Sequence, residues 1–501
     1  MSARVLIIGS GPTGATFARR LLDRSTAEVL MVEAGPPLSD PLGMNVRNIA
    51  DPSAQAAAKQ ASQGPAAAEA GVAGIPTGTV VEGTVTARQG THLIGRAALG
   101  STGMPAAAGA TCVGGQGAHW TCATPRPRGS ERIDFLDDEL DSLLDEAERI
   151  LHTTHEAFSG APQAIALLDV VDKEFAGDGL TVQPLPVAGD PQSDGSMRWS
   201  GSDVVLGDLA TPGAHADRFG LRTGTLAVRL VVENGVVVGA VLRDLHTGTE
   251  TEERADAVVV AADALRTPQL LWASGIRPDA LGRYLTEHPL VFGVVAVRDG
   301  LLPPPASGAA PVDPVRVVVG VRFDEDRHPF HAQMLYSPVC PVPLPPGSPY
   351  ADNPSGYVGM GWGVRKWPRA EDRVTFEDDV PDLNGLPGIR IAYEVTDREE
   401  AEMEHARTFQ ARAAQVLGSF IDGMPVVMPP GSSLHYMGTF RMGAEDDGTS
   451  VCDSYSRVWG VPGLVLAGNG LIPTANSCNP TLTSVALAVR GADALVDRLT
   501  T

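Results

Sequence analysis

Short runs of apolar residues alternate with helical patterns at the beginning of the chain. The run RVLII at Arg4–Ile8 stops at a glycine and predicts a buried strand. Apolar residues then recur at helical spacing over Thr13–Arg24, and the run EVLMVE at Glu28–Glu33 predicts a second buried strand. A strand, a helix and a strand in this order are typical of the opening unit of a parallel sheet.

The same signals return far along the chain. Thr225–Leu242 contains two apolar runs separated by Asn234-Gly235, a dipeptide that predicts a hairpin turn. Ala257–Ala262 and Leu464–Leu466 predict two more short buried strands, and Pro480–Leu499 predicts a long helix. Strands that return after such long insertions indicate a discontinuous domain.

Three other stretches are dominated by small residues, proline and glycine. Ala50–Thr79 has almost no large apolar side chains, so we expect a loose loop there. Leu301–Pro314 and Val339–Pro354 carry dense proline and glycine, which is typical of functional covers or disordered segments. Between these stretches, Ser130–His155 has leucines at helical spacing among acidic residues, and we expect an amphipathic helix that starts a second domain.

Composition limits the kind of protein that this chain can be. Its 501 residues are 43% apolar and 20% charged, which excludes a disordered or collagen-like protein and predicts two or three domains. No run of about 18 apolar residues occurs, so we expect no membrane span. The formal charge of −22 repels phosphate backbones and anionic lipids, which argues against nucleic acid or a membrane as a partner.

Cysteine usage and the start of the sequence bear on the compartment. The 5 cysteines include no CxxC pair, which favours a reduced compartment and excludes a zinc ribbon. The chain passes from Met1 almost directly into the first predicted strand, which leaves no room for a secretion signal. His328 and His331 lack an evident third ligand, so no metal site is expected. We therefore expect a cytoplasmic protein that binds no metal.

A glycine-rich fingerprint joins the first predicted strand to the first predicted helix. It has the pattern G-x-G-x-x-G and consists of Gly9, Ser10, Gly11, Pro12, Thr13 and Gly14. The first glycine makes a tight turn, the second lets the backbone approach a pyrophosphate, and the third lets the helix pack on the strand. The helix N-terminus supplies N–H donors to phosphates, and Glu33 accepts hydrogen bonds from ribose hydroxyls. This combination predicts a dinucleotide site, and the acidic Glu33 disfavours a 2′-phosphate.

Two dinucleotides fit this fingerprint, NAD and FAD. A nicotinamide-binding domain would continue as a repeated array of strands and helices. Here the later strands of the nucleotide domain return only near residues 225 and 464. The interleaving favours a flavoprotein.

At this point the sequence resembles the glucose–methanol–choline (GMC) family of FAD-dependent oxidoreductases, and within it the pyranose oxidases and related bacterial glycoside oxidases. Besides the fingerprint, the resemblance is carried by Val113–Pro125 (VGGQGAHWTCATP), Ala261–Gly275 (AADALRTPQLLWASG), Leu434–Gly443 (LHYMGTFRMG) and Leu466–Leu482 (LAGNGLIPTANSCNPTL). The segment HWTCATP points to the pyranose-oxidase branch, whereas the fingerprint alone does not discriminate.

The resemblance implies an α/β fold in two interleaved parts. A Rossmann-like FAD-binding domain of the GMC type would comprise residues 1–130, 211–295 and 431–501. An α+β substrate-binding domain, built on an antiparallel sheet, would comprise residues 131–210 and 296–430.

The resemblance also implies a catalytic pair, His435 and Asn479. Histidine titrates near neutral pH and can take an alcohol proton while hydride leaves the carbon. Asn479 can donate a hydrogen bond to the same oxygen without competing for the proton. Read without the family, the two would be a satisfied structural histidine and a loop asparagine.

Contacts to the cofactor follow from the same resemblance. His119 lies where relatives tether the flavin covalently, but Ala118 replaces the threonine that precedes the histidine in covalent relatives. We therefore expect non-covalent FAD, with a covalent link through His119 as the alternative. Thr121 would lie near flavin N5. Further cofactor contacts would come from Gly114, Gly115, Trp120, Cys122, Val228, Asn469, Gly470, Asn479 and Thr481.

The expected function is oxidation of a secondary hydroxyl, at carbon 2 or 3, of a sugar or of a C- or O-glucoside to a keto group. Hydride would pass to flavin N5, and the electrons would then pass to O2, giving H2O2, or to a quinone. The alternatives are a GMC enzyme acting on simple alcohols, an NAD-dependent dehydrogenase and a flavin-binding protein without turnover. Because the proline- and glycine-rich segments offer little apolar surface, we also expect an open entrance that admits a bulky aglycone.

Overall fold

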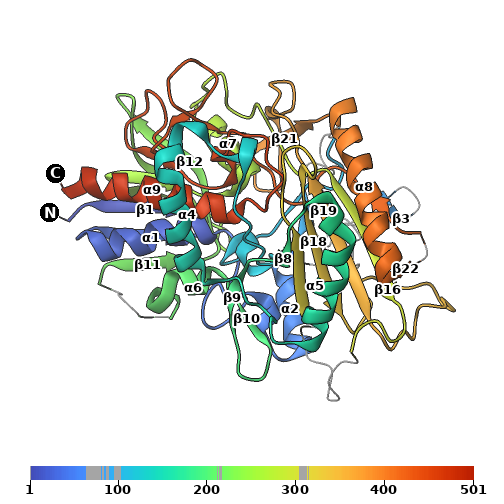
Figure 1. Ribbon diagram of the computed structural model, residues 1–501. Helices are drawn as coiled ribbons and strands as arrows, with labels where there is room; N and C mark the ends of the chain where they lie inside the picture. The colour runs from blue at the N-terminus through green and yellow to red at the C-terminus, as the bar shows by residue number, and fades with distance from the viewer. Residues whose placement is uncertain are drawn as a thin grey trace.

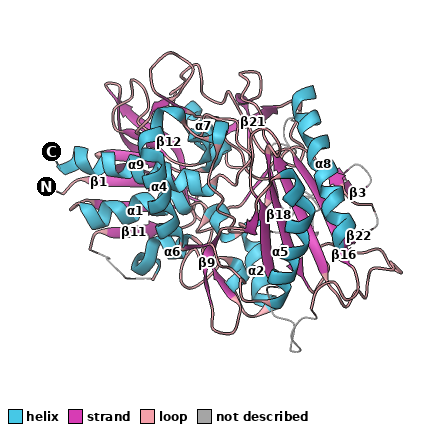
Figure 2. Ribbon diagram, viewed as in Figure 1, coloured by secondary structure: helices cyan, strands magenta, loops and turns pink. Residues whose placement is uncertain are grey.

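The two largest sheets of the fold have their own helices and lie side by side (Figure 1 and Figure 2). The structure is a computed structural model that describes residues 2–63, 80–81, 84–85, 90–94, 103–211, 213, 217–303, 313, 315–421 and 423–500. Both chain termini lie on the side of the first sheet, at the left of Figure 1. Within the described part of the chain, no helix is both long and apolar enough to cross a bilayer.

The first sheet is parallel and has the order β11-β2-β1-β15-β26. Its strands are β1 (Arg4–Ile8), β2 (Glu28–Val32), β11 (Phe219–Arg222), β15 (Ala257–Val260) and β26 (Leu464–Leu466). Four of these five strands confirm sequence predictions, and β11 was not predicted. β2 and β11 lie on one side of the central β1, and β15 and β26 lie on the other, so the strand order reverses beside β1 and a crevice opens there at the carboxyl ends of the strands.

Helices α1 (Pro12–Arg24), α4 (Asp137–Leu151) and α9 (Thr481–Thr500) pack together beside this sheet. The prediction of α9 is confirmed. The amphipathic helix expected over residues 130–155 exists but is shorter, since two turns of 3-10 helix precede it. Its buried face, including Leu140 and Leu144, joins the core of the parallel sheet. The division of the chain into two domains at residue 131 stays a prediction.

The predicted hairpin is confirmed. Strands β12 (Thr225–Glu233) and β13 (Val236–Asp244) pair in antiparallel fashion. Asn234 has φ of 50° and Gly235 has φ of 79°, which is the left-handed backbone that this two-residue turn requires. Strand β14 (Glu250–Arg254) extends the pair to three strands.

The second sheet is antiparallel, as the family resemblance implied. Its order is β22-β16-β19-β18-β17-β8, and β23 pairs with β16. Helices α5 (Pro162–Phe175) and α8 (Asp397–Leu417) cover one face of it (Figure 1). The strands are β8 (Val182–Pro184), β16 (Leu290–Val297), β17 (Val317–Val321), β18 (Phe330–Ser337), β19 (Tyr357–Val364), β22 (Gly418–Phe420) and β23 (Val426–Val427).

The loose loop expected over residues 50–79 is wrong in its first half. Pro52–Gln63 forms helix α2, because its alanines and glutamines favour a helix and the Asp51 carboxylate accepts a hydrogen bond from the Ala54 N–H at 2.7 Å. Residues 64–79 lie outside the described residues, as does most of Leu301–Pro314. Val339–Pro354 contains no helix or strand, in agreement with its dense proline and glycine.

Shorter elements complete the described part of the fold. The helices are α6 (Ser202–Leu206) and α7 (Asp263–Ala273). The strands are β3 (Val80–Val81), β4 (Thr84–Val85), β5 (His92–Leu93), β6 (Ala108–Gly109), β7 (Thr153–Thr154), β9 (Val187–Pro191), β10 (Met197–Trp199), β20 (Arg373–Pro381), β21 (Pro387–Ala392), β24 (Met442–Gly443) and β25 (Cys452–Asp453).

Candidate active site

A cavity of about 1390 Å³ lies between the two sheets. Residues that follow strands of the parallel sheet line one end of it, among them Gly9, Glu33 and Ala261. Residues from the antiparallel sheet, such as Phe292 and Gln333, line the other end. The cavity therefore occupies the place where open parallel sheets bind ligands, at the carboxyl ends of the strands.

The glycine fingerprint forms a tightly packed wall at the first end. Gly9 has φ of 106°, and a Cβ atom there would lie 2.3 Å from the carbonyl oxygen of Ala261. A Cβ atom at Gly14 would lie 2.2 Å from the carbonyl oxygen of Gly9, so only glycine lets α1 approach β1. Gly11 precedes α1 without a side-chain cap, and the first turn of α1 has no acidic residue. The N–H groups of this turn are thus available to an anionic ligand.

Glu33 lines the cavity beside the fingerprint. One carboxylate oxygen accepts hydrogen bonds from the Ser10 hydroxyl at 2.7 Å and the Ser10 N–H at 3.2 Å, and the other accepts from the Gly35 N–H at 2.9 Å. Burial raises the pKa of this carboxyl above its ordinary value. These bonds fix the side chain at the position where the fingerprint expects a ribose partner.

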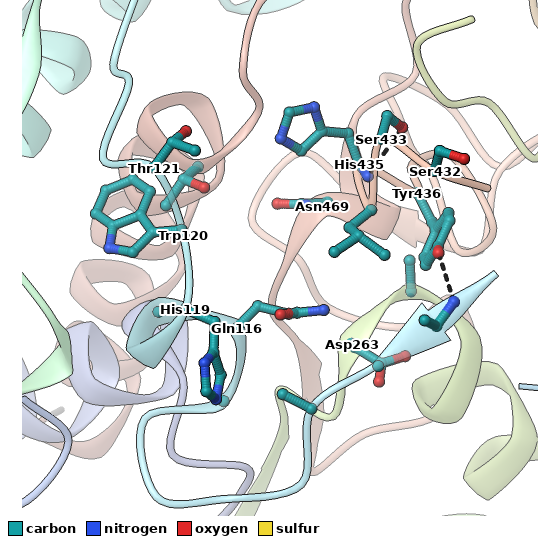
Figure 3. Close-up of a pocket in the computed structure, with 18 of the residues that line it drawn as sticks. Gln116, His119, Trp120, Thr121, Asp263, Ser432, Ser433, His435, Tyr436 and Asn469 are labelled. Carbon is teal, nitrogen blue, oxygen red and sulfur yellow. Dashed lines mark hydrogen bonds between the residues drawn. The ribbon is translucent and has the colours of Figure 1, made fainter. Parts of the chain in front are cut away.

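The loop that carries the HWTCATP motif forms another wall. In Figure 3, Thr121 lies across the cavity from His435, whereas His119, which also lines the cavity, has its ring directed away from His435. The Nε2 atom of His119 lies 3.9 Å from the Cys112 sulfur. The Trp120 indole donates a hydrogen bond to the Ser200 carbonyl at 2.7 Å.

Most of the predicted site residues meet in this one cavity, and five do not line it. Cys122 packs behind the wall, where its sulfur lies 3.4 Å from the Ser200 carbonyl oxygen and burial raises its pKa to about 12. Val228 lies on β12 and packs in a small core with Val241 and Leu386, and its neighbours Leu226 and Ala227 line the cavity instead. Gly14, Gly114 and Gly470 also lie behind the lining.

The start of α9 closes the middle of the cavity. Asn469, Thr481 and Ser484 line it, and the Ser484 hydroxyl donates a hydrogen bond to Asn469 Oδ1 at 2.6 Å. A Cβ atom at Gly470 would lie 2.1 Å from the Phe440 ring, which explains why glycine occupies that position. The positive end of the α9 dipole thus lies at the cavity wall.

His435 is anchored through its backbone and through its ring. Its N–H donates to the Ser433 hydroxyl oxygen at 3.2 Å, and that hydroxyl donates to Glu287 at 2.8 Å. The Gly431 N–H donates to the other Glu287 oxygen at 2.6 Å, and burial raises the pKa of this carboxyl to about 7. The Nδ1 atoms of His435 and His288 lie 3.0 Å apart.

Asn479 is anchored from strand β18. The Gln333 amide N–H donates a hydrogen bond to Asn479 Oδ1. Two positions earlier on β18, His331 Nε2 lies 3.2 Å from a carboxylate oxygen of Glu131. The other oxygen of Glu131 accepts from the Ser477 hydroxyl at 2.7 Å and from the Ser477 N–H at 2.8 Å. One face of β18 therefore holds the loop that presents Asn479.

Glu131, His331 and Cys478 lie within 4.8 Å of one another and could in principle hold a metal ion. Both oxygens of Glu131 already accept hydrogen bonds from the protein. Burial also raises the pKa of the Cys478 thiol well above its ordinary value, which disfavours the thiolate that binds metals. The cluster is better explained as a structural network, and the expectation of no metal stays a prediction.

An apolar trough extends from Asn479 toward the outside. On β19, Val358, Met360 and Trp362 pack under the helices, so the alternating Gly359, Gly361 and Gly363 face the cavity. Gly361 pairs with Phe292 of β16 on one side and with Gln333 of β18 on the other. A Cβ atom at Gly361 would meet no atom within 4 Å, whereas one at Gly359 would lie 3.7 Å from Pro341. The trough is therefore open over Gly361.

The walls of the trough are more apolar than expected. Val342 and Leu344, within the segment Val339–Pro354, pack with Phe292 and Met424 around a small core. The expectation that this segment offers little apolar surface is wrong, because valine and leucine alternate there with prolines that line the same cavity. The apolar lining of this end includes Leu290, Phe292, Leu335, Pro341, Val342, Leu344, Met424, Val426 and Met428.

Four of the anchoring residues escaped the sequence analysis: Glu131, Glu287, His288 and Gln333. None belongs to a local motif, and each bonds to a residue far away in the sequence. The dipeptide Glu287-His288, one residue before the apolar run that begins at Leu290, is a local signal that could have drawn attention to two of them.

Comparison with known proteins identifies the family to which this chain belongs. Residues 196–290 and 368–488 match the GMC oxidoreductase family. A C-glycoside 3-oxidase from Microbacterium trichothecenolyticum is 46% identical over 99% of this chain and 97% of its own length. A pyranose 2-oxidase from Tricholoma matsutake is 31% identical over 99% of this chain and 94% of its own length.

The crystal structure of pyridoxine 4-oxidase from Mesorbium loti aligns with a TM-score of 0.66 at 18% identity, over 98% of this chain and 99% of that one. It supports the fold alone. The resemblance found in the sequence is thereby confirmed: identity of 46% along nearly the whole length shows that this chain belongs to the GMC oxidoreductase family of FAD-dependent enzymes.

Proposed function

We propose that this enzyme oxidises a secondary hydroxyl of the sugar ring of a glycoside to a keto group with bound FAD. The observation that carries the proposal is the position of His435 and Asn479. Both line a cavity whose one end is the nucleotide fingerprint and whose other end is an apolar trough. Membership of the GMC family sets aside the NAD-dependent alternative.

The cavity fits FAD along its nucleotide end. The glycines of the fingerprint leave the backbone uncovered, and the uncapped N-terminus of α1 offers donors to a pyrophosphate. Glu33 would bind the ribose and Asn469 would contact the pyrophosphate, while Thr121 and Thr481 would contact the flavin part. When bound, FAD supplies the acceptor for a hydride from the alcohol carbon.

His435 and Asn479 have different roles at the alcohol oxygen. His435 takes the hydroxyl proton as the carbon loses hydride, a role worth about 10²–10⁴-fold in rate. Because Gln333 donates to Asn479 Oδ1, the N–H₂ side of this amide is the part that can donate to the alcohol oxygen. The carboxamide therefore orients the substrate and leaves the proton to His435.

The apolar trough supports a glycoside as the substrate. A free sugar presents polar edges, whereas an aryl aglycone presents a flat apolar face that can lie against Gly361 and Phe292. The name C-glycoside 3-oxidase of the relative that is 46% identical supports the same substrate class. Carbon 3 of a C- or O-glucoside is thus the proposed position, and carbon 2 is the alternative suggested by the pyranose 2-oxidase. A simple alcohol, the other alternative, would leave the trough empty.

We keep three finer points as proposals. Non-covalent FAD is supported by the His119 ring, which packs against Cys112 within the protein. Molecular oxygen or a quinone would reoxidise the flavin, and the names of both relatives favour oxygen. A cytoplasmic location is supported by the free state of all 5 cysteines.

The test is a set of flavin-reduction and turnover measurements on one preparation. Free glucose, an aryl C-glucoside, an aryl O-glucoside and ethanol are each mixed anaerobically with the yellow enzyme, and bleaching of the flavin is followed. Peroxide formation in air and reduction of a benzoquinone are then compared. Fast bleaching by the glucosides supports the proposal, and the product's carbonyl position, determined by NMR, decides between carbon 3 and carbon 2. Bleaching by ethanol alone would reject the sugar assignment.

A further inference from the structure

The ring of His435 has an unusual partner. His288 lies two residues before the first residue of β16 and is buried, with 4% of its surface exposed. Its Nδ1 lies 3.0 Å from Nδ1 of His435, and the two rings meet edge to face at 67°. No carboxylate contacts the His288 ring among the hydrogen bonds and ion pairs of the described residues, since both oxygens of Glu287 are bound by Gly431 and Ser433. The partner of the proposed base is thus a second imidazole.

We propose that His288 is a positioning residue, which accepts a hydrogen bond from Nδ1–H of His435 and so keeps Nε2 of His435 deprotonated to receive the alcohol proton. This inference rests on the proposed function of His435 and adds a second residue to it. Only one hydrogen fits between two facing nitrogens 3.0 Å apart. If His288 were the donor, a neutral His435 would carry its hydrogen on Nε2 and could not act as a base there.

Burial favours the state of His288 that this arrangement needs. Loss of hydration in the interior holds the pKa of His288 well below its ordinary value, and the nearby His435 and His331 act in the same direction. A neutral imidazole always has one nitrogen that can accept. After the alcohol proton reaches Nε2, His435 is an imidazolium with hydrogen on both nitrogens, and the bond to His288 then stabilises its charge.

The step is balanced within the proposed reaction. The alcohol O–H bond breaks and its proton forms the Nε2–H bond of His435, while the hydride of the same carbon passes with two electrons to bound FAD. The hydrogen on His435 Nδ1 stays where it is, and His288 remains neutral. A neutral partner stabilises the imidazolium less than a carboxylate would, so the proton can leave again after each cycle.

The backbones of the two histidines are held by one clamp. The Ser433 hydroxyl oxygen accepts the N–H of His435 at 3.2 Å and the N–H of His288 at 3.5 Å, and it donates to Glu287. The titratable groups beside the pair include Glu287, which is adjacent to His288 in the sequence, and His331. The Tyr436 phenol, next to His435 in the sequence, donates to the Gly431 carbonyl and accepts from the Ala108 N–H, and burial raises its pKa well above its ordinary value. Substitution of His288 changes the ring contact and leaves this clamp in place.

The test compares His288→Leu, His288→Gln and His288→Asp by stopped-flow flavin reduction over a range of pH with an aryl glucoside. We expect His288→Leu to slow reduction about 10–100-fold at saturating substrate, with the flavin spectrum and the substrate Kd unchanged. His288→Gln offers a carbonyl acceptor and should restore part of the rate. His288→Asp places a negative charge beside His435, and we expect the pH below which reduction slows to rise by about 1 unit.

His328→Leu is the matched control. His328 is also a buried histidine, but it packs among Phe330, Trp362 and Phe409 in the core of the antiparallel sheet. We expect its reduction rate and pH profile to match those of the wild type. If His288→Leu and His288→Gln reduce flavin at the wild-type rate and pH dependence, the positioning role is overturned. If His435→Ala itself reduces flavin normally, the proposed function fails instead, and the two failures are distinguishable.

Discussion

The two ends of the cavity are built in different ways. At the nucleotide end, backbone groups and glycines of one short segment, Gly9–Gly14, form most of the predicted binding site. Glu33 lies only 19 residues after Gly14 in the sequence. At the substrate end, residues from distant segments hold one another in pairs through their side chains: Gln333 holds Asn479, and His288 contacts His435. A site built from backbone groups and glycines tolerates few substitutions, but it can be recognised from a local sequence pattern. A site built from side chains can be altered by substituting one residue at a time.

The largest effect is expected from His435→Ala, at the substrate end of the cavity. We expect flavin reduction by an aryl glucoside to fall about 10²–10⁴-fold, because the proton acceptor is lost. The yellow flavin should remain bound, because the nucleotide end of the cavity is untouched. Anaerobic stopped-flow absorbance measures both. Reduction at a rate near that of the wild type would mean that another group takes the proton.

Asn479→Ala should have a smaller effect on the same rate. One hydrogen bond to the alcohol oxygen is lost, which corresponds to about a 10–100-fold slower reduction. Gln333→Leu is the informative companion, because it releases the Asn479 amide without removing it. An Asn479→Ala rate below that of His435→Ala would reverse the proposed order of the two residues.

Gly361→Leu tests whether the trough at the substrate end holds the aglycone. The leucine side chain would fill the open part of the trough, so we expect kcat/KM for an aryl glucoside to fall about 10-fold while that for free glucose changes little. Gly160→Leu is the control, since Gly160 is exposed and its added side chain meets nothing within 4 Å. Equal losses for both substrates would show that the trough does not hold the aglycone.

The pKa of Glu287 predicts a dependence of stability on pH. Its carboxyl has a pKa of about 7 in the folded protein against 4.5 in the unfolded chain, so the folded state binds more protons between these values. Its contribution to stability is complete below pH 4.5 and is lost as the pH rises to about 7. Thermal unfolding of the wild type and of Glu287→Gln should show a flatter profile for the variant over this window.

The smallest effect is expected from His119→Ala. Acid precipitation of the wild type should release the flavin into the supernatant, because we propose that no covalent bond forms. The variant should still bind flavin and bleach with substrate. Flavin that remains with the precipitated wild-type chain, and is released from the variant, would establish the covalent alternative.

Local patterns were enough to predict much of the parallel sheet. β1, β2, β15 and β26 are continuous apolar runs, and the hairpin turn at Asn234 has a two-residue signature. β11 was missed because FGLR is short and contains a glycine. α2 was missed because small residues are common in loops too, although alanine favours helices.

The substrate end could not be assembled from the sequence in the same way. Gln333 and Asn479 are 146 residues apart, and Glu131 bonds to Ser477 across 346 residues. Such pairs are created by the packing of the two sheets and leave no local periodicity. The family resemblance located His435 and Asn479, but it named none of the residues that hold them.

The sheet behind the substrate end separates positions that can be redesigned from positions that cannot. β18 carries both Gln333 and His331, so a change of its side chains alters the trough and the setting of Asn479 together. Phe292 on β16 and Gly361 on β19 face the same trough and make no side-chain hydrogen bond to either proposed catalytic residue. Libraries aimed at new aglycones should therefore vary β16 and β19 and keep β18 constant, since specificity can then change while the catalytic geometry is inherited intact.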